Sequence, residues 1–191
     1  MALDARISIR HPTLGICGLS CRLCPRFQST AASRCGGCKT ASRLGAACSI
    51  QTCALKKQNV EFCGDCSVSE SCRKWADHRE AGRKHDSFIS YQKLEDNIAL
   101  IKQHGVSVWE QLQRKKERLL RKLLAEYNEG RSGSYLCLAV TLLELGDLEA
   151  AMAEEKKSRP AQSDLKNRSK AIHTILDRLA NKRHLVLALR K

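Results

Sequence analysis

The feature that most constrains this chain is the crowding of its cysteines. Ten of the eleven lie between Cys17 and Cys72, and the remaining one is Cys137. Two residues separate the members of three pairs, which are Cys21 and Cys24, Cys35 and Cys38, and Cys63 and Cys66. Such spacing lets both side chains of a pair converge on one ion while the amides of the turn point at the sulfurs. The sequence therefore predicts thiolate-bound metal in this stretch.

We expect all ten clustered cysteines to be metal ligands: Cys17, Cys21, Cys24, Cys35, Cys38, Cys48, Cys53, Cys63, Cys66 and Cys72. Glycines at positions 36, 37 and 64 suit tight turns in two of the pairs, since glycine accepts positive φ without steric cost. A disulfide scaffold is less favoured, because the N-terminus contains no apolar run of signal-peptide length and disulfides persist mainly in oxidising compartments. We therefore expect a cytoplasmic protein with no membrane partner.

The ten thiolates do not divide evenly into sets of four. Spacing alone groups eight of them into two sets: Cys21, Cys24, Cys35 and Cys38, and then Cys48, Cys53, Cys63 and Cys66. Cys17 and Cys72 are left over. His78 and His85 follow closely and would raise the number of ligands to twelve, although a histidine near a helix start is more often a surface residue. The partition among ions stays open at this stage.

Two cofactors fit this pattern. Structural zinc, in two or more four-cysteine sites, is the first expectation. A [4Fe–4S] cluster is the alternative, because such clusters often take three closely spaced cysteines and one distant one, and a proline follows Cys24 as in some ferredoxin runs. Cys17 distinguishes the two, since a pair of four-cysteine zinc sites leaves it spare and an iron–sulfur cluster would use it.

The rest of the chain has the periodicity of helices. Apolar residues at steps of three and four predict helices over 87–104, 107–127, 134–143, 147–157 and 165–179, with a break at Gly105. Residues 185–189 could form a short strand or more helix. The cysteine-rich stretch shows no such period, so we expect metal, and no hydrophobic core of its own, to hold it. The predicted fold is mainly α, with an irregular metal-stabilised domain at 1–75 and a helical domain at 76–191.

Charge points to a further alternative. The formal net charge is +14, and a basic stripe at helical spacing contains Arg114, Arg118, Arg121 and Lys122. A stripe of this kind is usually a solvated face, but beside zinc knuckles it could bind the phosphates of a nucleic acid. No aromatic residues alternate with these basic side chains, which weakens the case for single-strand binding.

The segment between the second and third expected helices is rich in turn residues. Arg131 and Ser134 stand there, and together with free backbone amides they could hold a small anion. A helix stop and start is the favoured interpretation of the same residues. Cys137 lies in an apolar helix and is expected to be a packed thiol. We identify no catalytic residues, and the chain is more readily understood as a binding protein than as an enzyme.

Four stretches together carry a resemblance to a known family: CGLSCRLCP, CGGC, CSIQTCALKKQNVEFCGDCSVSESC and YNEGRSGSYLCLAVTLL. In the order and spacing of its ten cysteines the chain resembles the bacterial and archaeal family called domain of unknown function 3795, from Cys17 to the final LALRK. The resemblance implies a cysteine-rich, metal-binding module and no established reaction. Family members often carry proline before the last cysteine, whereas this chain has Ser71, which makes Cys72 less secure as a ligand.

Overall fold

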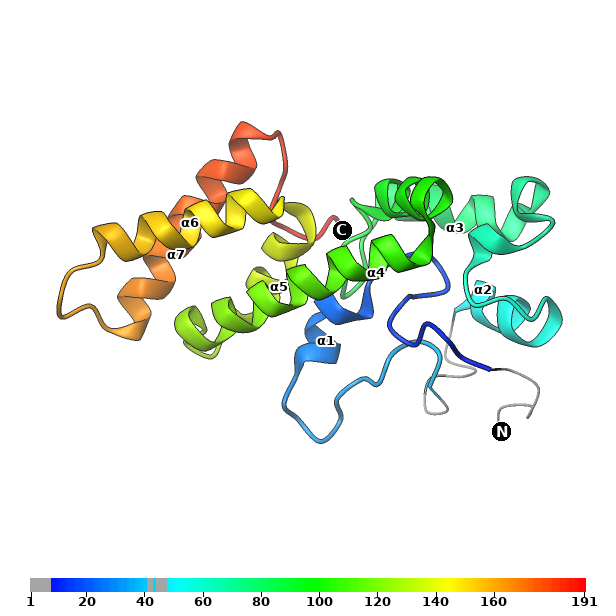
Figure 1. Ribbon diagram of the computed structural model, residues 1–191, viewed down its shortest axis with the longest axis horizontal. Helices are drawn as coiled ribbons and strands as arrows, with labels where there is room; N and C mark the ends of the chain where they lie inside the picture. The colour runs from blue at the N-terminus through cyan, green and yellow to red at the C-terminus, as the bar shows by residue number, and fades with distance from the viewer. Residues whose placement is uncertain (1–7, 41–42, 44–47) are drawn as a thin grey trace.

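A computed structural model of the chain describes residues 8–40, 43 and 48–191. The described residues form an elongated helical molecule, with α2 and α3 near one end and the loop between α6 and α7 at the other (Figure 1). Its longer helices are α3 (Arg73–Lys84), α4 (Leu94–Tyr127), α5 (Gly133–Leu142), α6 (Leu145–Ser158) and α7 (Leu165–Lys182). The cysteine-rich part contributes shorter pieces: η1 (Cys21–Leu23), α1 (Pro25–Gln28), α2 (Ser49–Thr52), η3 (Cys53–Lys57), η4 (Cys63–Asp65) and η5 (Ser69–Ser71). The expectation of a mainly α fold is confirmed.

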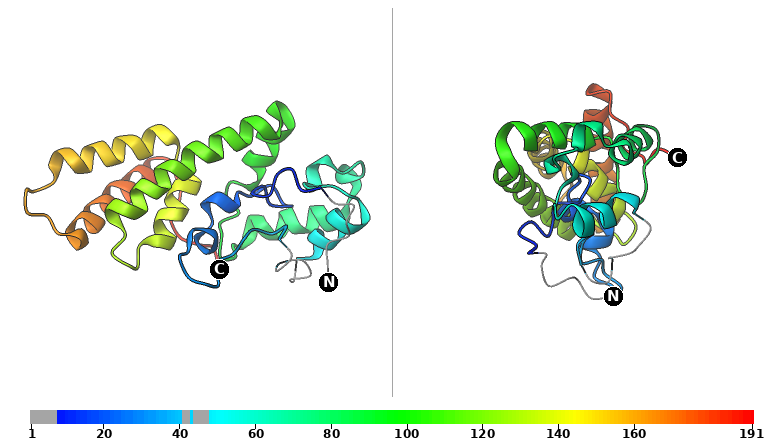
Figure 2. Two further views of the ribbon diagram at one scale, coloured as in Figure 1. Left: turned by 60° about the horizontal axis from the view of Figure 1, so that its bottom comes forward. Right: turned by 90° about the vertical axis from the view of Figure 1, so that its right-hand side faces the viewer.

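The long helix α4 runs along the middle of the molecule, from the side of α3 toward α6 and α7, as the left view of Figure 2 shows. It bends at Gly105, whose φ of 81° and ψ of 163° are not helical. The predicted break at this glycine is therefore confirmed. The helix begins at Leu94, later than the predicted start at residue 87. The reason is Asp86, whose carboxylate accepts a hydrogen bond from the backbone N–H of Tyr91 at 2.6 Å and so holds the preceding residues in a loop.

A first hydrophobic cluster, here called the C-terminal cluster, joins the second part of α4 to α5, α6 and α7. Its fully buried side chains include Leu120, Leu136 and Leu176. The predicted placement of α5 at the centre of the core is confirmed, because most of its residues are buried. Asp164 caps α7 by accepting a hydrogen bond from the N–H of Asn167 at 2.7 Å.

A second cluster, here called the N-terminal cluster, joins the cysteine-rich part to α3 and α4, so this part packs into a shared apolar core. Leu14, Ile16 and Phe62 are at most 2 % exposed, and they pack with Trp75 of α3 and Trp109 of α4. The irregular backbone thus encloses an apolar core. Sequence periodicity missed this core because its members come from loops and very short helices, which carry no period. The sequence pattern does not predict the helix α3, which contributes the side chain of Trp75 to the same cluster.

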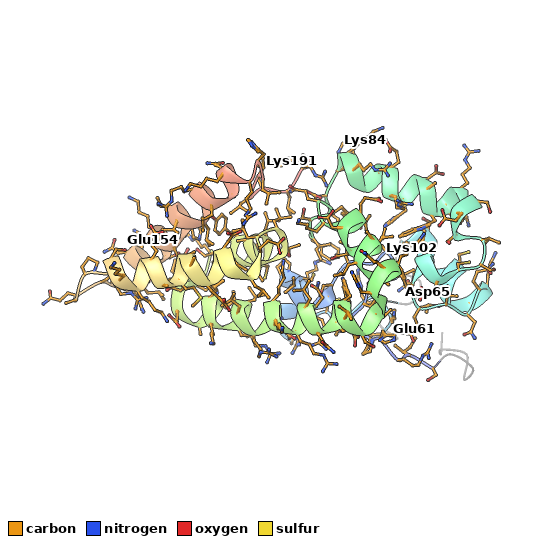
Figure 3. All side chains as sticks on the ribbon, turned by 45° about the horizontal axis from the view of Figure 1, so that its top comes forward. Glu61, Asp65, Lys84, Lys102, Glu154 and Lys191 are labelled. Carbon is orange, nitrogen blue, oxygen red and sulfur yellow. The ribbon has the colours of Figure 1, made fainter. Side chains whose placement is uncertain are left out.

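The last nine residues do not form the short strand considered for 185–189. Beyond α7 the chain is irregular, and it is anchored by Arg190, whose guanidinium donates to the carboxylate of Asp86 at 2.8 Å and to the carbonyl oxygen of Gly82 at 2.8 Å. Figure 3 accordingly shows Lys191 close to Lys84, at the end of α3. Within the described residues, the strand pairing is limited to an isolated bridge between Leu14 and Ser20.

None of the helices in the described part of the chain is long and apolar enough to cross a membrane.

Candidate metal centre

Six cysteines line one cavity of about 430 Å³. They are Cys17, Cys21, Cys24, Cys35, Cys38 and Cys48. The cavity lies between the loop that follows Leu14, the helices α1 and α2, and residues 87–91 before α4. All eleven cysteines of the chain are described, and each is a free thiol. The fold therefore gathers thiols that are up to 31 positions apart in sequence, counted from Cys17 to Cys48.

The first three cysteines are placed by a tight loop. The bridge between Leu14 and Ser20 closes this loop around Cys17, and η1 then turns the chain from Cys21 to Cys24. Burial raises the pKa of the Cys24 thiol, while the backbone amides of Phe27 and Arg26 act against that rise. Amides directed at a sulfur favour its charged form, which is the form that binds metal.

The pair Cys35 and Cys38 forms the turn predicted for a metal knuckle. The N–H of Gly37 donates to the Cys35 sulfur at 3.4 Å, and Gly37 has a φ of 108°. A side chain at this position would be strained, and its Cβ would meet the carbonyl oxygen of Pro12 at 3.1 Å. Gln51 of α2, which is buried, donates its side-chain amide to the carbonyl oxygen of Cys38 and fixes the turn against α2.

The thiols of Cys21 and Cys38 are in contact, with their sulfurs 3.9 Å apart. The contact lowers the pKa of Cys38 to about 6 and raises that of Cys21, because one proton is shared between two partly buried sulfurs. Two thiolates that bind one tetrahedral zinc ion, each about 2.3 Å from the metal, lie about 3.8 Å apart. The pair is therefore already at the separation that a shared ion requires.

Cys17 belongs to the same cavity. Burial raises its pKa to about 12, and the charges of Cys38 and then Cys48 add to that rise. The sequence left Cys17 as a surplus ligand, but the structure places it beside the pair formed by Cys21 and Cys38. A Cβ added to Gly15 would lie 3.5 Å from the Cys17 sulfur and 3.7 Å from the Cys38 sulfur, which shows how near the two are.

The other four clustered cysteines form a second group, in which Cys53, Cys66 and Cys72 lie near Cys63. Burial raises the pKa of Cys63 to about 12, and the charges that add to the rise are, in decreasing order, those of Cys72, Cys53, Cys66 and Cys48. The turn at Cys63 needs Gly64 for a reason other than φ: a Cβ there would overlap the ring of Phe62, at 2.3 Å. The structure thus associates Cys72 with this group more strongly than Cys48, which spacing had placed there.

No family model, curated protein or solved structure matches this chain. In residues 8–40, 43 and 48–191, no three histidine, cysteine, aspartate or glutamate side chains converge closely enough to hold an ion as they stand. What the structure supplies is one thiol pair at ligand spacing, within a cavity lined by four further thiols.

The two candidate histidines differ in their surroundings. His78 lies on α3 and lines the cavity, and burial lowers its pKa. His85 is exposed at the C-terminal end of the same helix and does not line the cavity. Of the two, only His78 is placed where it could reach a metal held by the cavity cysteines.

The predicted anion site lies elsewhere. Arg131 and Ser134 are both exposed at the start of α5, away from the residues that line the cysteine cavity. The carboxylate of Glu129 occupies this loop instead, accepting hydrogen bonds from the hydroxyls of Ser132 at 2.5 Å and Ser169 at 2.9 Å. These contacts favour the helix stop and start that the sequence indicated.

The basic stripe lies on a solvent-exposed face of α4. Arg114 is 3.8 Å from the carboxylate of Glu110, and Arg121 is 2.8 Å from that of Glu117. Both pairs are one helical turn apart, so the stripe is partly neutralised by its own helix.

Sequence reasoning missed a buried ion pair beside the cavity. Lys39 is 3 % exposed, and its ammonium group donates to the carboxylate of Glu61 at 2.9 Å and to the carbonyl oxygen of His11 at 2.9 Å. The same carboxylate accepts from the N–H groups of Arg10 and His11. Figure 3 shows Glu61 next to Asp65 at the cysteine-rich end of the molecule, far from Glu154 on α6. In the sequence, the signal that could have indicated this ion pair is the lysine placed directly after the Cys35–Cys38 turn.

Proposed function

We propose that this chain is a metal-binding protein whose clustered cysteines hold zinc through their thiolates. The observation that carries the proposal is the pair formed by Cys21 and Cys38, with sulfurs 3.9 Å apart in a cavity lined by six cysteines. Thiolates select zinc and other thiophilic ions, and four of them complete a closed structural site. The resemblance to domain of unknown function 3795 supports the same conclusion.

The donor set fits such an ion. Cys24 interacts electrostatically with Cys35 and with Cys38, so two further thiols lie near the contacting pair and bring the set to four. Backbone amides act on Cys24, Cys35 and Cys38, and amides of this kind stabilise thiolate charge. Lys39 adds a positive charge that lowers the pKa of Cys38. The first site would be held by Cys21, Cys24, Cys35 and Cys38.

The second four-cysteine site would be formed by Cys53, Cys63, Cys66 and Cys72. Burial has the largest effect on the Cys63 thiol, and the charges of Cys72, Cys53 and Cys66 follow in that order. Both sites would be closed by sulfur, and a closed zinc site contributes to folding without providing an open position for a substrate. We therefore propose a binding or regulatory module, in a reducing compartment such as the cytoplasm, rather than an enzyme.

Replacing one member of the contacting pair tests the proposal. In Cys21→Ser, protein purified without air should contain about one zinc equivalent fewer than the unaltered chain, by elemental analysis. Cys137→Ser is the matched control, because Cys137 is also buried but lies in α5 among apolar side chains. The proposal fails if the Cys21 variant keeps its full metal content, or if the unaltered chain contains none.

An iron–sulfur cluster is the second candidate, and the position of Cys17 favours it. Cys17 lies near Cys38 and Cys48 inside the cavity, so the site offers more thiols than one zinc ion binds. A cluster would give the anaerobically purified protein a brown colour with broad visible absorbance, and elemental analysis would find iron. A colourless protein that contains zinc and no iron would exclude this candidate.

A further inference from the structure

His78 has an unusual environment for a histidine. Its Nε2 atom is buried and has no hydrogen-bond partner among the residues that the structure describes, although the side chain lines the cavity with the six cysteines. An unpaired polar atom in the protein interior is destabilising, so a buried nitrogen of this kind calls for an explanation. An imidazole nitrogen with a free lone pair is also one of the commonest ligands of zinc.

The ring of His78 is held in place by two aromatic neighbours. It stacks on Trp75, with ring centroids 6.1 Å apart and planes 14° from parallel, and it meets the edge of Tyr91 at 5.6 Å. Trp75 is 3 % exposed and belongs to the N-terminal cluster. The imidazole therefore has a fixed orientation, as a metal ligand needs, rather than being free to turn toward solvent.

Tyr91 also indicates which cysteines share this side of the cavity. Burial raises the pKa of its hydroxyl most, and the charges of Cys17, Cys48 and Cys38 add to the rise in that order, while a hydrogen bond with Ser87 acts against it. Cys17 and Cys48 are also close enough to affect each other. These two are the cysteines of the cavity that remain once Cys21, Cys24, Cys35 and Cys38 are assigned to one ion.

We propose that His78, Cys17 and Cys48 form a mixed nitrogen–sulfur site for a second thiophilic divalent ion in the same cavity. The proposal rests on the proposed function, because it assumes that the neighbouring four cysteines also hold metal. It assigns every clustered cysteine without a surplus: four thiols to one site, two thiols and a histidine to the next, and four thiols around Cys63. A site with three protein ligands keeps one exchangeable position, unlike the two closed sites.

His78→Phe is the informative variant. Phenylalanine keeps the aromatic packing against Trp75 and Tyr91 but has no nitrogen to bind a metal. If His78 only fills space, the replacement removes an unpaired buried nitrogen and leaves metal content unchanged. If His78 is a ligand, the variant loses one ion while remaining folded. His85→Phe is the matched control, since His85 lies at the end of the same helix and outside the cavity.

Cobalt substitution gives a readout that does not depend on any activity. The protein, purified without air, is loaded with Co²⁺, whose visible d–d bands move to longer wavelength as nitrogen ligands are replaced by sulfur. We expect the unaltered chain to show a band component from the mixed site, and His78→Phe to lose that component together with about one equivalent of bound cobalt. Cys17→Ser and Cys48→Ser should lose the same component, whereas His85→Phe should keep it.

The results separate this proposal from the one on which it rests. If the unaltered chain binds no cobalt or zinc, both fail. If it binds metal and His78→Phe retains the same stoichiometry and spectrum, the mixed site is overturned while the four-cysteine sites stand. Circular dichroism of each variant shows that a loss of metal does not come from unfolding of the helices.

Discussion

The two hydrophobic clusters of this molecule are built from different kinds of structure. Apart from Leu23 of η1, the C-terminal cluster joins helices of ten or more residues, and its members are mostly leucine, isoleucine and alanine. The N-terminal cluster joins loops and helices of three to five residues to α3 and α4, and it depends on the rings of Phe62, Trp75 and Trp109. Helices this short are not stable by themselves. The comparison teaches that a small apolar core built from loops and short helices arranges the cysteines, which under the proposed function metal would then cross-link.

Removing metal should produce the largest difference between the two clusters. Structural zinc contributes on the order of 10 kcal/mol to folding in small domains. We therefore expect a strong chelator to destabilise residues 10–72 while leaving the second part of α4, α5, α6 and α7 folded. Hydrogen exchange measured with and without chelator checks this directly. Equal loss of protection in both clusters would show that they unfold as one unit.

Matched truncations in the two clusters should lower the stability of the fold by similar amounts but should differ in their effect on zinc binding. Phe62→Ala and Leu120→Ala each remove a side chain that is 0 % exposed, and each should lower the free energy of unfolding by about 3–4 kcal/mol. Only Phe62→Ala should also weaken zinc binding, because the Phe62 ring packs over the turn at Gly64 between Cys63 and Cys66. Chemical denaturation and zinc titration together measure the two effects.

The C-terminal cluster should show a pH dependence of its own through Lys116. Its ammonium group donates to the carbonyl oxygens of Leu143 at 2.9 Å and Thr141 at 3.3 Å, and burial lowers its pKa from 10.5 to about 8. Between these two pH values the unfolded chain binds more protons at this residue than the folded chain. The contribution of Lys116 to stability should therefore rise with pH from about 8 to about 10.5, by up to about 1.4 kcal/mol per pH unit.

Lys116→Met provides the reference for that measurement. The difference in unfolding free energy between the unaltered chain and Lys116→Met should move in favour of the unaltered chain as pH rises through this window. A difference that stays constant with pH would contradict the lowered pKa.

We expect the smallest effect on stability from replacing either of two positive-φ glycines with alanine. The two variants, Gly37→Ala and Gly105→Ala, differ in whether the glycine lies near a cysteine. Gly37 has a φ of 108° and Gly105 a φ of 81°, so alanine at either position should cost about 1–2 kcal/mol. A Cβ at Gly37 would also lie 3.6 Å from the Cys21 sulfur, whereas a Cβ at Gly105 meets no atom within 4 Å. We therefore expect Gly37→Ala, and not Gly105→Ala, to weaken zinc binding, as measured by competition with a chromogenic chelator.

The helical part of the fold was largely predictable, and the cysteine-rich part was not. The break at Gly105 and the buried helix α5 follow from glycine and from an apolar run, which are local signals. The late start of α4 depends on Asp86 bonding to the Tyr91 amide and to Arg190, a residue 104 positions away. No local pattern reveals a contact of that kind.

The candidate site likewise has some features that local sequence predicts and others that depend on distant contacts. The Cys35–Cys38 turn, with Gly37 at positive φ, is a property of a few neighbouring residues and was predicted. The placement of Cys17 beside Cys38, of Cys72 beside Cys63 and of His78 in the cavity depends on how α2, α3 and the loop at Leu14 pack. The core around Phe62 is what brings these segments together, and loop residues of that kind give no periodic signal.

The most direct test of the central claim is the metal content of the unaltered protein purified without air. Elemental analysis and a count of reactive thiols should be made on the same sample. The account predicts two or more zinc ions per chain, with most of the ten clustered thiols protected until a chelator is added. A metal-free protein in which all ten clustered thiols react at once would contradict this prediction.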